Sequence, residues 1–193
     1  GRNTVREAVR TLVAYGILEI RRPEGTFVCR TFKPQTINPL IYSMILQKKE
    51  SYQDLIGLRQ CIEFGTLQVI MEQGLNPEDA ENLRQIAVSI ERELDEPNPD
   101  PKLICRTDIA FHDAIAKATR NDLIVTVNEM LSKLTYGSRI RTIEQCIREQ
   151  DRKYLVDIHF EILKILEERD TDAIAHTLKR SYSYWANLQM EEE

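Results

Sequence analysis

Apolar residues recur at helical spacing through most of the chain, and after residue 30 no segment alternates between apolar and polar positions as a strand does. Glycine and proline divide this body into segments of helical length. Gly74 closes the first segment, and a proline-rich stretch over 97–101 separates two others. The pattern predicts helices over 52–73, 76–95, 102–119, 121–136, 140–168 and 171–190. We therefore expect the body to be an all-α bundle.

The first thirty residues follow a different pattern. A stripe of apolar residues at helical spacing predicts a helix with one buried face, formed by Val5, Ala8, Val9 and Leu12. Thr4 and Glu7 fit a capping box at the start of this helix, and Gly16 suits its end. Two short extended segments over 17–21 and 26–30 follow, joined by a turn that contains proline and glycine, and together they predict a β-hairpin.

Charge is distributed unevenly along the chain. Residues 1–33 carry seven basic and three acidic side chains, a net charge of +4, and because the whole chain carries −5 the remainder carries −9. Arg2, Arg6 and Arg10 lie on one side of the predicted helix, although like charges four residues apart repel one another on a bare helix. A bound polyanion accounts for this arrangement, so we expect the amino-terminal segment to bind one.

The composition of the 193 residues, with 42% hydrophobic and 30% charged positions, is typical of a globular protein and excludes collagen-like, disordered and membrane-spanning classes. No signal-peptide pattern is present. The four cysteines lie more than thirty residues apart, which excludes a zinc ribbon and a C-x-x-C redox motif. Reduced thiols, and therefore a cytoplasmic protein, are expected.

The basic helix and hairpin are typical of a winged helix, in which the helix enters the major groove and the hairpin contacts the DNA backbone or minor groove. The segment over 2–10, then Gly16-Ile17-Leu18 and Gly25-Thr26-Phe27-Val28, resembles the recognition helix and wing of the GntR family of DNA-binding domains. The resemblance implies contacts with a double-stranded DNA operator, made by Arg2, Thr4, Arg6, Arg22 and Gly25. The alternative is that Thr4 only caps the helix and the arginines are solvated.

In that family two further helices precede the recognition helix, at which this sequence begins. We therefore expect residues 1–32 to be a partial winged helix, truncated at its amino end, that binds DNA poorly by itself. Residues 33–50 combine prolines and polar positions with an apolar patch, and they are predicted to be a linker and a short helix. Residues 51–193 then form the helical domain.

The helical domain resembles the FCD effector domain, which accompanies the GntR module in the FadR subfamily. The resemblance rests on the order and spacing of several short motifs: Leu58-Arg59 with Glu63, Asp108-Ile109-Ala110-Phe111-His112 with Arg120-Asn121, His159-Phe160-Glu161-Ile162-Leu163, and Asp170 with Asp172-Ala173. It implies a regulator whose helical domain binds a small molecule. Such regulators act as homodimers, because two copies read two half-sites.

Asp108 and His112 are four residues apart, so one face of a helix presents both a carboxylate and an imidazole. The resemblance implies that Asp108, His112 and His159 are three of four ligands of a divalent metal such as zinc, nickel or manganese. The fourth position falls at Ser181, and a hydroxyl is a poor ligand beside imidazoles. The site is then either a three-ligand site completed by water or effector, or a relic. Otherwise the histidines are ordinary, partly buried side chains.

In metal-containing members the ion and nearby cations receive a small carboxylate. Arg59 and Arg139 are the candidate clamps, because a guanidinium holds a carboxylate with two hydrogen bonds. Asn121 and Ser181 are further candidates for effector contact. The alternatives are that Arg59 pairs with Glu63, that Arg139 is solvated and that Asn121 caps its helix.

The sequence therefore predicts a regulator that senses a small anionic metabolite and is not an enzyme. One alternative is a metal-free regulator of a larger acyl or anionic effector. Another, from a different class, is a metal-dependent hydrolase that uses Asp108, His112 and His159, although no H-E-x-x-H or comparable motif supplies a general base. A helical scaffold would leave the basic amino-terminal face unexplained.

Overall fold

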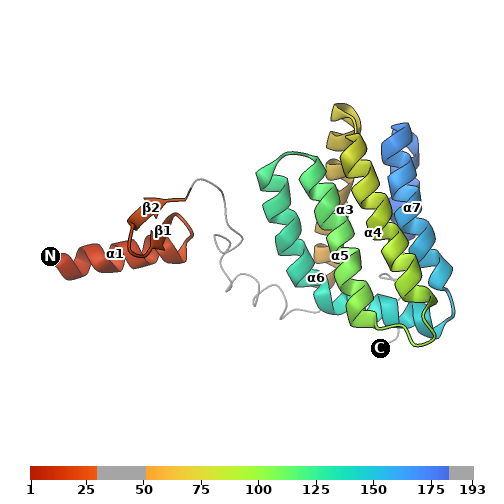
Figure 1. Ribbon diagram of the computed structural model, residues 1–193, viewed down its shortest axis with the longest axis horizontal. Coiled ribbons are helices and arrows are strands. Elements are labelled where there is room, and N and C mark those ends of the chain that lie inside the picture. Colours follow the sequence, from red (N-terminus) through yellow and green to blue (C-terminus); the bar gives the residue numbers. More distant parts are fainter. Residues whose placement is uncertain (30–50, 183–193) are drawn as a thin grey trace.

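The computed structural model describes residues 1–29 and 51–182, and Figure 1 labels its helices and strands. The linker and short helix predicted over 33–50 lie outside the described residues. The part of the chain after Tyr182 lies outside them as well.

The described amino-terminal residues form a helix followed by an antiparallel hairpin. These elements are α1 (Arg2–Ala14), β1 (Leu18–Arg21) and β2 (Gly25–Val28). Leu18 pairs with Val28 and Arg21 with Gly25, so the predicted hairpin is confirmed. Gly16 has φ +68, the left-handed conformation that the predicted end of the helix requires.

Two expectations for α1 are wrong. The helix begins at Arg2 with Gly1 as its N-cap, so Thr4 lies inside the helix and does not cap it, because nothing between Arg2 and Thr4 interrupts helical geometry. Glu7 instead accepts a hydrogen bond of 2.9 Å from Arg10. The apolar stripe is also not buried: α1 has no buried residue, and Val5 is 64% exposed. A stripe becomes buried only where another element covers it.

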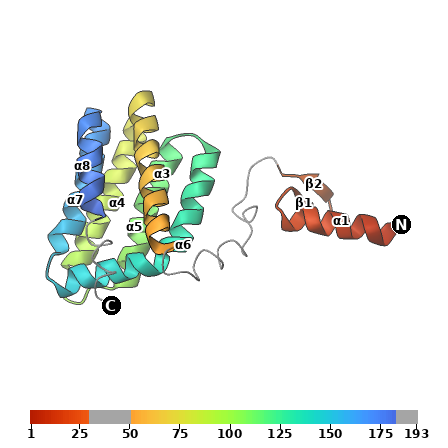
Figure 2. The same cartoon turned by 180° about the vertical axis from the view of Figure 1, so that it is seen from behind.

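From residue 51 to residue 182 the chain forms six helices (Figures 1 and 2). They are α3 (Ser51–Gln73), α4 (Pro77–Asp95), α5 (Pro101–Ala118), α6 (Asp122–Arg148), α7 (Arg152–Glu168) and α8 (Thr171–Ser181). The predicted all-α body is confirmed. None of the described helices combines the length and the apolar character that crossing a membrane requires.

The helix boundaries in the first half of the bundle follow signals in the sequence. Gly74 adopts φ +86 where α3 ends. Asn76 accepts a hydrogen bond from the backbone N–H of Glu78 at 2.8 Å, and Asp100 accepts one from Lys102 at 2.9 Å. Each of these two caps is followed by a proline at the first helical position, which loses no hydrogen bond there.

The boundary predicted near residue 138 is wrong. Helix α6 is continuous through Gly137, and the break comes at 149–151, where Gln150 adopts φ +60 without a glycine or proline signal. A single glycine costs a helix only about 1 kcal/mol, which tertiary packing offsets. The ribbon of α6 does change direction along its length, so that its last part runs across the end of the bundle (Figures 1 and 2). A glycine followed by a serine, Gly137-Ser138, lies within α6, and such pairs are a known cause of bends in helices.

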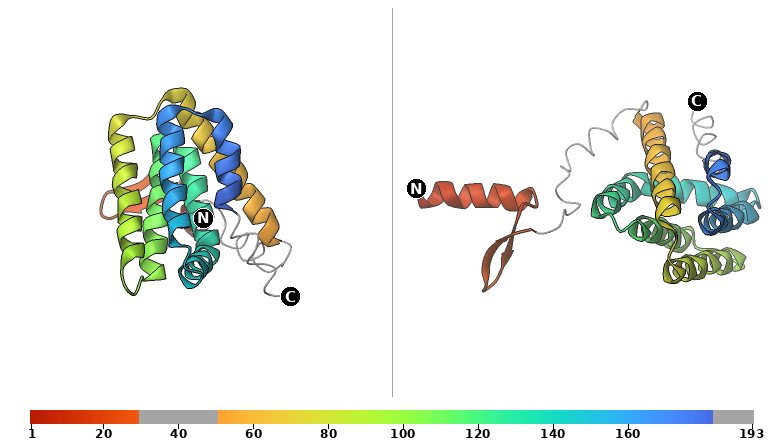
Figure 3. Two further views of the ribbon diagram at one scale, coloured as in Figure 1. Left: turned by 90° about the vertical axis from the view of Figure 1, so that its right-hand side faces the viewer. Right: turned by 90° about the horizontal axis from the view of Figure 1, so that it is seen from above.

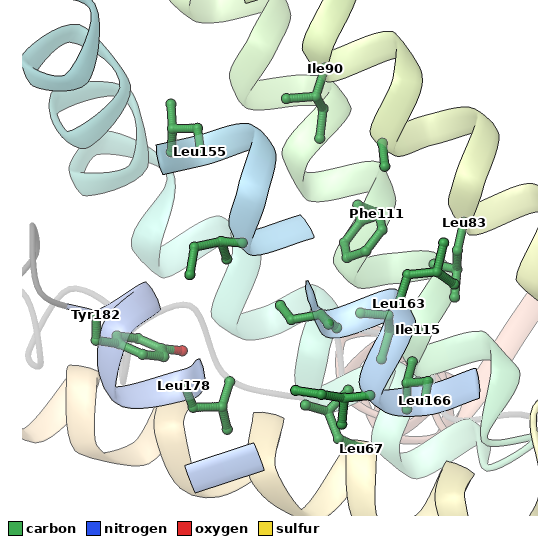
Figure 4. Close-up of a cluster of buried hydrophobic side chains, with 14 of the residues drawn as sticks. Leu67, Leu83, Ile90, Phe111, Ile115, Leu155, Leu163, Leu166, Leu178 and Tyr182 are labelled. Atoms are coloured by element: carbon green, nitrogen blue, oxygen red, sulfur yellow. The ribbon is translucent and has the colours of Figure 1, made fainter. Parts of the chain in front are cut away.

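Helix α5 packs between α4 and α6, α7 packs against α4 and α8, and α8 returns to α3 (Figure 3). The apolar faces of these helices meet in one core, part of which Figure 4 shows around Phe111 and Leu163. Its most deeply buried side chains include Leu67, Leu83, Ile90, Phe111, Ile115, Leu163 and Leu166. This core is the rigid frame on which the polar side chains described next are held.

Candidate functional site

A cavity of about 50 Å³ lies among α3, α5, α6, α7 and the end of α8. Its walls carry charged and imidazole groups, which protein interiors hold only when they are paired or bound to a ligand. They are Arg59 and Glu63 from α3, Asp108 and His112 from α5, Arg139 from α6 and His159 from α7. Residues that are far apart in the sequence therefore form one polar cluster inside the bundle.

Asp108, His112 and His159 form a set that could hold a metal ion. Each offers one ligand atom, and these atoms all lie within 4.8 Å of one another. Asp108 Oδ1 lies 3.1 Å from Nε2 of His159 and 3.8 Å from Nε2 of His112. The two α5 residues are one helical turn apart, and His159 approaches them from α7.

The second nitrogen of each imidazole is already engaged. Nδ1 of His159 lies 2.6 Å from the carbonyl oxygen of Leu155, which only accepts, so in the neutral ring the proton sits on Nδ1. Nδ1 of His112 lies 3.1 Å from Oε1 of Glu63 and donates to it in the same way. Both Nε2 atoms then carry lone pairs, as does the carboxylate of Asp108. Three acceptors converge on one point, which suits a cation.

Phe111 forms the apolar floor beneath the two imidazoles. Its ring meets His159 edge to face at a centroid distance of 4.8 Å, and it meets His112 at 5.9 Å. The Phe111 side chain is fully buried. Both histidines are thus held by packing as well as by hydrogen bonds.

Arg139 determines the charge state of Asp108. Its guanidinium is 4% exposed and donates to Asp108 Oδ2, so the prediction that Arg139 could be a solvated side chain does not describe this structure. Burial by itself would raise the pKa of Asp108, but the Arg139 cation holds that pKa well below its usual range. Asp108 is therefore a carboxylate, with one oxygen bound to Arg139 and the other facing the histidines.

Glu63 connects three helices at the back of the site. Its carboxylate lies 3.7 Å from Nε of Arg59 and accepts hydrogen bonds from His112 and from the hydroxyl of Tyr182. Burial opposes ionisation, but His112 and Arg59 lower the pKa of Glu63 below its usual range. Burial also lowers the pKa of His112, against the opposing effect of Glu63, which favours the neutral, ligating form of this imidazole.

Arg59 and Arg139 both line the cavity, where we predicted carboxylate clamps. The expected pairing of Arg59 with Glu63 is present as well. Nη2 of Arg59 lies 3.4 Å from Nε2 of His112. The guanidinium thus donates to the same lone pair that a metal ion would use. The Arg59 guanidinium also lies over the ring of Tyr182, 5.5 Å from its centre.

Ser181 occupies the end of α8 beside the cavity. Its hydroxyl donates to the carbonyl of Leu178 at 2.8 Å, a bond within its own helix. Asn121 is the N-cap of α6: its side chain accepts from the N–H groups of Leu123 and Ile124, and it is not among the residues that line the cavity.

The residues predicted to contact DNA lie in the amino-terminal elements. Arg2, Thr4 and Arg6 are on α1, and Arg22 and Gly25 are at the turn of the hairpin. All five are exposed. Arg6 has Glu7 as a neighbour, with Nε and Oε1 4.0 Å apart, a contact too exposed and long to hold the guanidinium in place.

Sequence reasoning did not assign two polar residues of the cavity wall to the site. Glu63 was considered as part of a motif and as a partner of Arg59, and Thr142 was not considered. Two spacings contain a signal for them. Glu63 lies four residues after Arg59, and Thr142 lies three residues after Arg139, so each shares a helical face with a predicted site residue.

Comparison with known proteins shows which family this architecture belongs to. Residues 54–183 match the FCD domain family. The chain is 26% identical over 169 residues to the HTH-type transcriptional regulator LutR of Bacillus subtilis, covering 88% of this chain and 71% of LutR. It is 31% identical over 127 residues to the putative L-lactate dehydrogenase operon regulatory protein of Escherichia coli, covering 64% of this chain but only 46% of that protein.

Among solved structures, Streptococcus agalactiae GntR superposes with a TM-score of 0.60 at 21% sequence identity, over 94% of this chain and 81% of that one. At this identity the likeness shows a shared fold. The fold and the relatives define a class, the transcriptional regulators with an all-α effector domain. Within that class the chain belongs to the FCD domain family of GntR-type regulators, as the sequence predicted.

Proposed function

We propose that the helical domain holds a divalent metal ion at Asp108, His112 and His159 and uses it, with the neighbouring arginines, to sense a small organic acid. The observation that carries this proposal is the convergence of three lone-pair atoms within 4.8 Å. Because Glu63 and the Leu155 carbonyl take the other imidazole protons, His159 Nε2 and Asp108 Oδ1 are two acceptors 3.1 Å apart. Such a pair is stabilised by a cation between them.

The donor set fits zinc, nickel or manganese, since two imidazole nitrogens and one carboxylate suit these ions. Three protein ligands leave coordination positions for water or effector, and Ser181 adds none while its hydroxyl bonds to Leu178. When bound, the ion supplies a fixed positive charge that polarises and holds a carboxylate.

Charge balance favours an anionic ligand. The charged side chains that line the cavity are Arg59, Arg139, Glu63 and Asp108, which sum to zero. A divalent ion leaves an excess of two positive charges in a buried site, and an acid anion offsets part of it. Arg59 and Arg139 are placed to hydrogen-bond that anion, because both guanidinium groups line the same cavity.

The size of the cavity favours a short acid over a larger acyl effector. About 50 Å³ is far below the roughly 300–1,000 Å³ of pockets that enclose drug-sized ligands. The name of one relative, a putative L-lactate dehydrogenase operon regulatory protein, agrees with a small acid. We propose a short-chain carboxylate as the effector.

The amino-terminal elements bind the DNA operator in this proposal. The exposed arginines of α1 suit the phosphate backbone of an operator, and effector binding changes operator affinity in a homodimer, with a coupling free energy on the order of 1–3 kcal/mol. We assign no catalytic role to the residues of the cavity. Within the described cavity both carboxylates, Glu63 and Asp108, are already bound to cations and histidines, which leaves neither as a general base for hydrolysis.

Elemental analysis of protein purified without a histidine tag or chelator tests the metal site. We expect about one zinc, nickel or manganese ion per chain, lost in His112→Ala because one of three ligands is removed. His176→Ala is the matched control, since His176 is exposed on α8 and removing it should leave the metal content unchanged. Absence of metal after loading with each of the three ions, or equal loading of both variants, would contradict the proposed site.

A further inference from the structure

The guanidinium of Arg59 contacts an atom that the proposed metal site needs. Arg59 lies on α3 and is 7% exposed. Its Nη2 atom lies 3.4 Å from Nε2 of His112. Because Nδ1 of His112 donates to Glu63, Nε2 carries the lone pair, and a guanidinium can only donate. The contact is therefore a hydrogen bond to the lone pair with which His112 would bind a metal ion.

The second arginine of the cavity is placed differently. Arg139 donates to Oδ2 of Asp108, and Oδ1 of the same carboxylate lies 3.1 Å from Nε2 of His159. A carboxylate can bind a cation through one oxygen while its other oxygen accepts a hydrogen bond, but an imidazole nitrogen has a single lone pair and cannot do both. Arg139 is thus compatible with an ion at Asp108, whereas the hydrogen bond from Arg59 excludes an ion at His112.

The contact with Arg59 is the weaker of the two polar contacts that hold the imidazole of His112. Nδ1 lies 3.1 Å from Glu63, whereas the 3.4 Å between Nε2 and Arg59 is long for a hydrogen bond made by nitrogen. Arg59 can therefore leave Nε2 while Glu63 keeps the ring oriented. Arg59 also keeps other partners when it moves, since its Nε lies 3.7 Å from Glu63 and its guanidinium lies over the ring of Tyr182. Only a local movement of Arg59 is needed.

We propose that Arg59 is an internal competitor of the metal ion: its hydrogen bond to Nε2 of His112 must break before that atom can ligate an ion, and this lowers the metal affinity of the site. The inference rests on the proposed metal site. Competition of this kind reduces the apparent affinity by the fraction of molecules in which the ligand atom is free. Arg59 therefore makes metal occupancy depend on the supply of the ion, so that metal availability becomes a second signal to the regulator.

Arg59→Lys tests the inference without changing the charge of the cavity. The lysine ammonium can stay beside Glu63, but the side chain ends one bond before Nη2, the atom that contacts His112. We expect Arg59→Lys to bind zinc about 10-fold more tightly than the wild type, the worth of one hydrogen bond that involves a charged group. Competition between the protein and a chromophoric zinc chelator, at one fixed pH, measures both affinities.

Arg139→Lys is the matched control, because it makes the same substitution at the other arginine of the same cavity. Arg139 binds Oδ2 of Asp108 and does not exclude an ion, so Arg139→Lys should not tighten zinc binding. Arg59→Met is a second variant that removes every donor of the guanidinium, and it should tighten zinc binding at least as much as Arg59→Lys. Circular dichroism shows whether each variant is folded.

Nitrogen-15 NMR of the imidazoles tests the contact directly in zinc-free protein. The Nε2 signal of His112 should move between the wild type and Arg59→Lys, because this nitrogen loses its hydrogen-bond donor. The signals of the exposed His176 should stay in place. An unchanged Nε2 signal of His112 would overturn the inference.

The affinities separate this inference from the proposed metal site. If the wild type binds zinc and the two Arg59 variants bind it equally or less tightly, the competition is overturned and the metal site stands. Equal tightening in Arg59→Lys and Arg139→Lys indicates a general loosening of the cavity and also overturns the competition. If neither the wild type nor the Arg59 variants bind zinc, the metal site is contradicted, and the role of Arg59 with it.

Discussion

The amino-terminal elements and the helical bundle distribute apolar and charged groups in opposite ways. Helix α1 has no buried residue, and some of its apolar side chains, such as Val5 and Leu12, are exposed. In the bundle, apolar side chains such as Phe111 are fully buried, and the charged groups Arg139 and Asp108 are enclosed with them. Exposed apolar groups indicate a surface that needs a covering partner, whereas buried charged groups indicate a site that needs a ligand.

The first test compares the reactivity of cysteine thiols in the two regions, and here we expect the largest difference. Burial, with Asp151 and Glu149 adding to it, raises the pKa of Cys146 to about 12. At pH 8 only about one such thiol in ten thousand is ionised, and it is also enclosed. Native protein treated with iodoacetamide should be modified at Cys29 and at the exposed Cys61, and not at Cys146, as measured by peptide mass spectrometry.

The sign of the pH effect follows from the direction of this shift. A pKa raised by folding means that the thiol of Cys146 ionises more readily in the unfolded chain. Stability is therefore full below the ordinary thiol pKa of about 9 and falls as pH rises towards 12. Modification in urea should be equal at all cysteines. Rapid modification of Cys146 in the native state at pH 8 would show that the bundle is loosely packed.

The second test compares matched apolar truncations in the two regions. Phe111→Ala should lower the free energy of unfolding of the bundle by about 3–5 kcal/mol, because it leaves a cavity beneath both imidazoles. Val5→Ala should change it by less than about 0.5 kcal/mol, since Val5 is 64% exposed. Urea denaturation followed by circular dichroism measures both, and a similar cost for the two variants would mean that α1 is packed as tightly as the bundle.

The third test, with the smallest expected effect, concerns charge. In protein that carries a complete winged helix, Arg6→Ala should weaken operator binding several-fold. It should also reduce the slope of log affinity against log salt concentration by about one, because one fewer counterion is released. The bundle offers Arg92, an exposed arginine of α4, as the control whose removal changes neither quantity. Fluorescence anisotropy at two salt concentrations distinguishes these outcomes. An unchanged affinity for Arg6→Ala would remove Arg6 from the set of DNA contacts.

Local signals were sufficient where the controlling interaction is local. The cap at Asn76, the left-handed glycines Gly16 and Gly74, and the hairpin were all predictable, because each depends on residues within a few positions. The break after α6 was not, since Gln150 carries no turn signal and Gly137 is tolerated inside a helix. There, packing against the rest of the bundle outweighs the intrinsic preference of one residue.

The sequence by itself determined the helical periodicity of the body, the basic character of the amino-terminal segment and the one-turn spacing of Asp108 and His112. Only the tertiary structure decided that His159 approaches them from α7 and that Glu63 and the Leu155 carbonyl orient the two imidazoles. It also decided that Arg59 contacts the imidazole of His112. The reason is physical: periodicity fixes which residues share a face of one helix, while the identity of the facing helix depends on how all the apolar faces pack together.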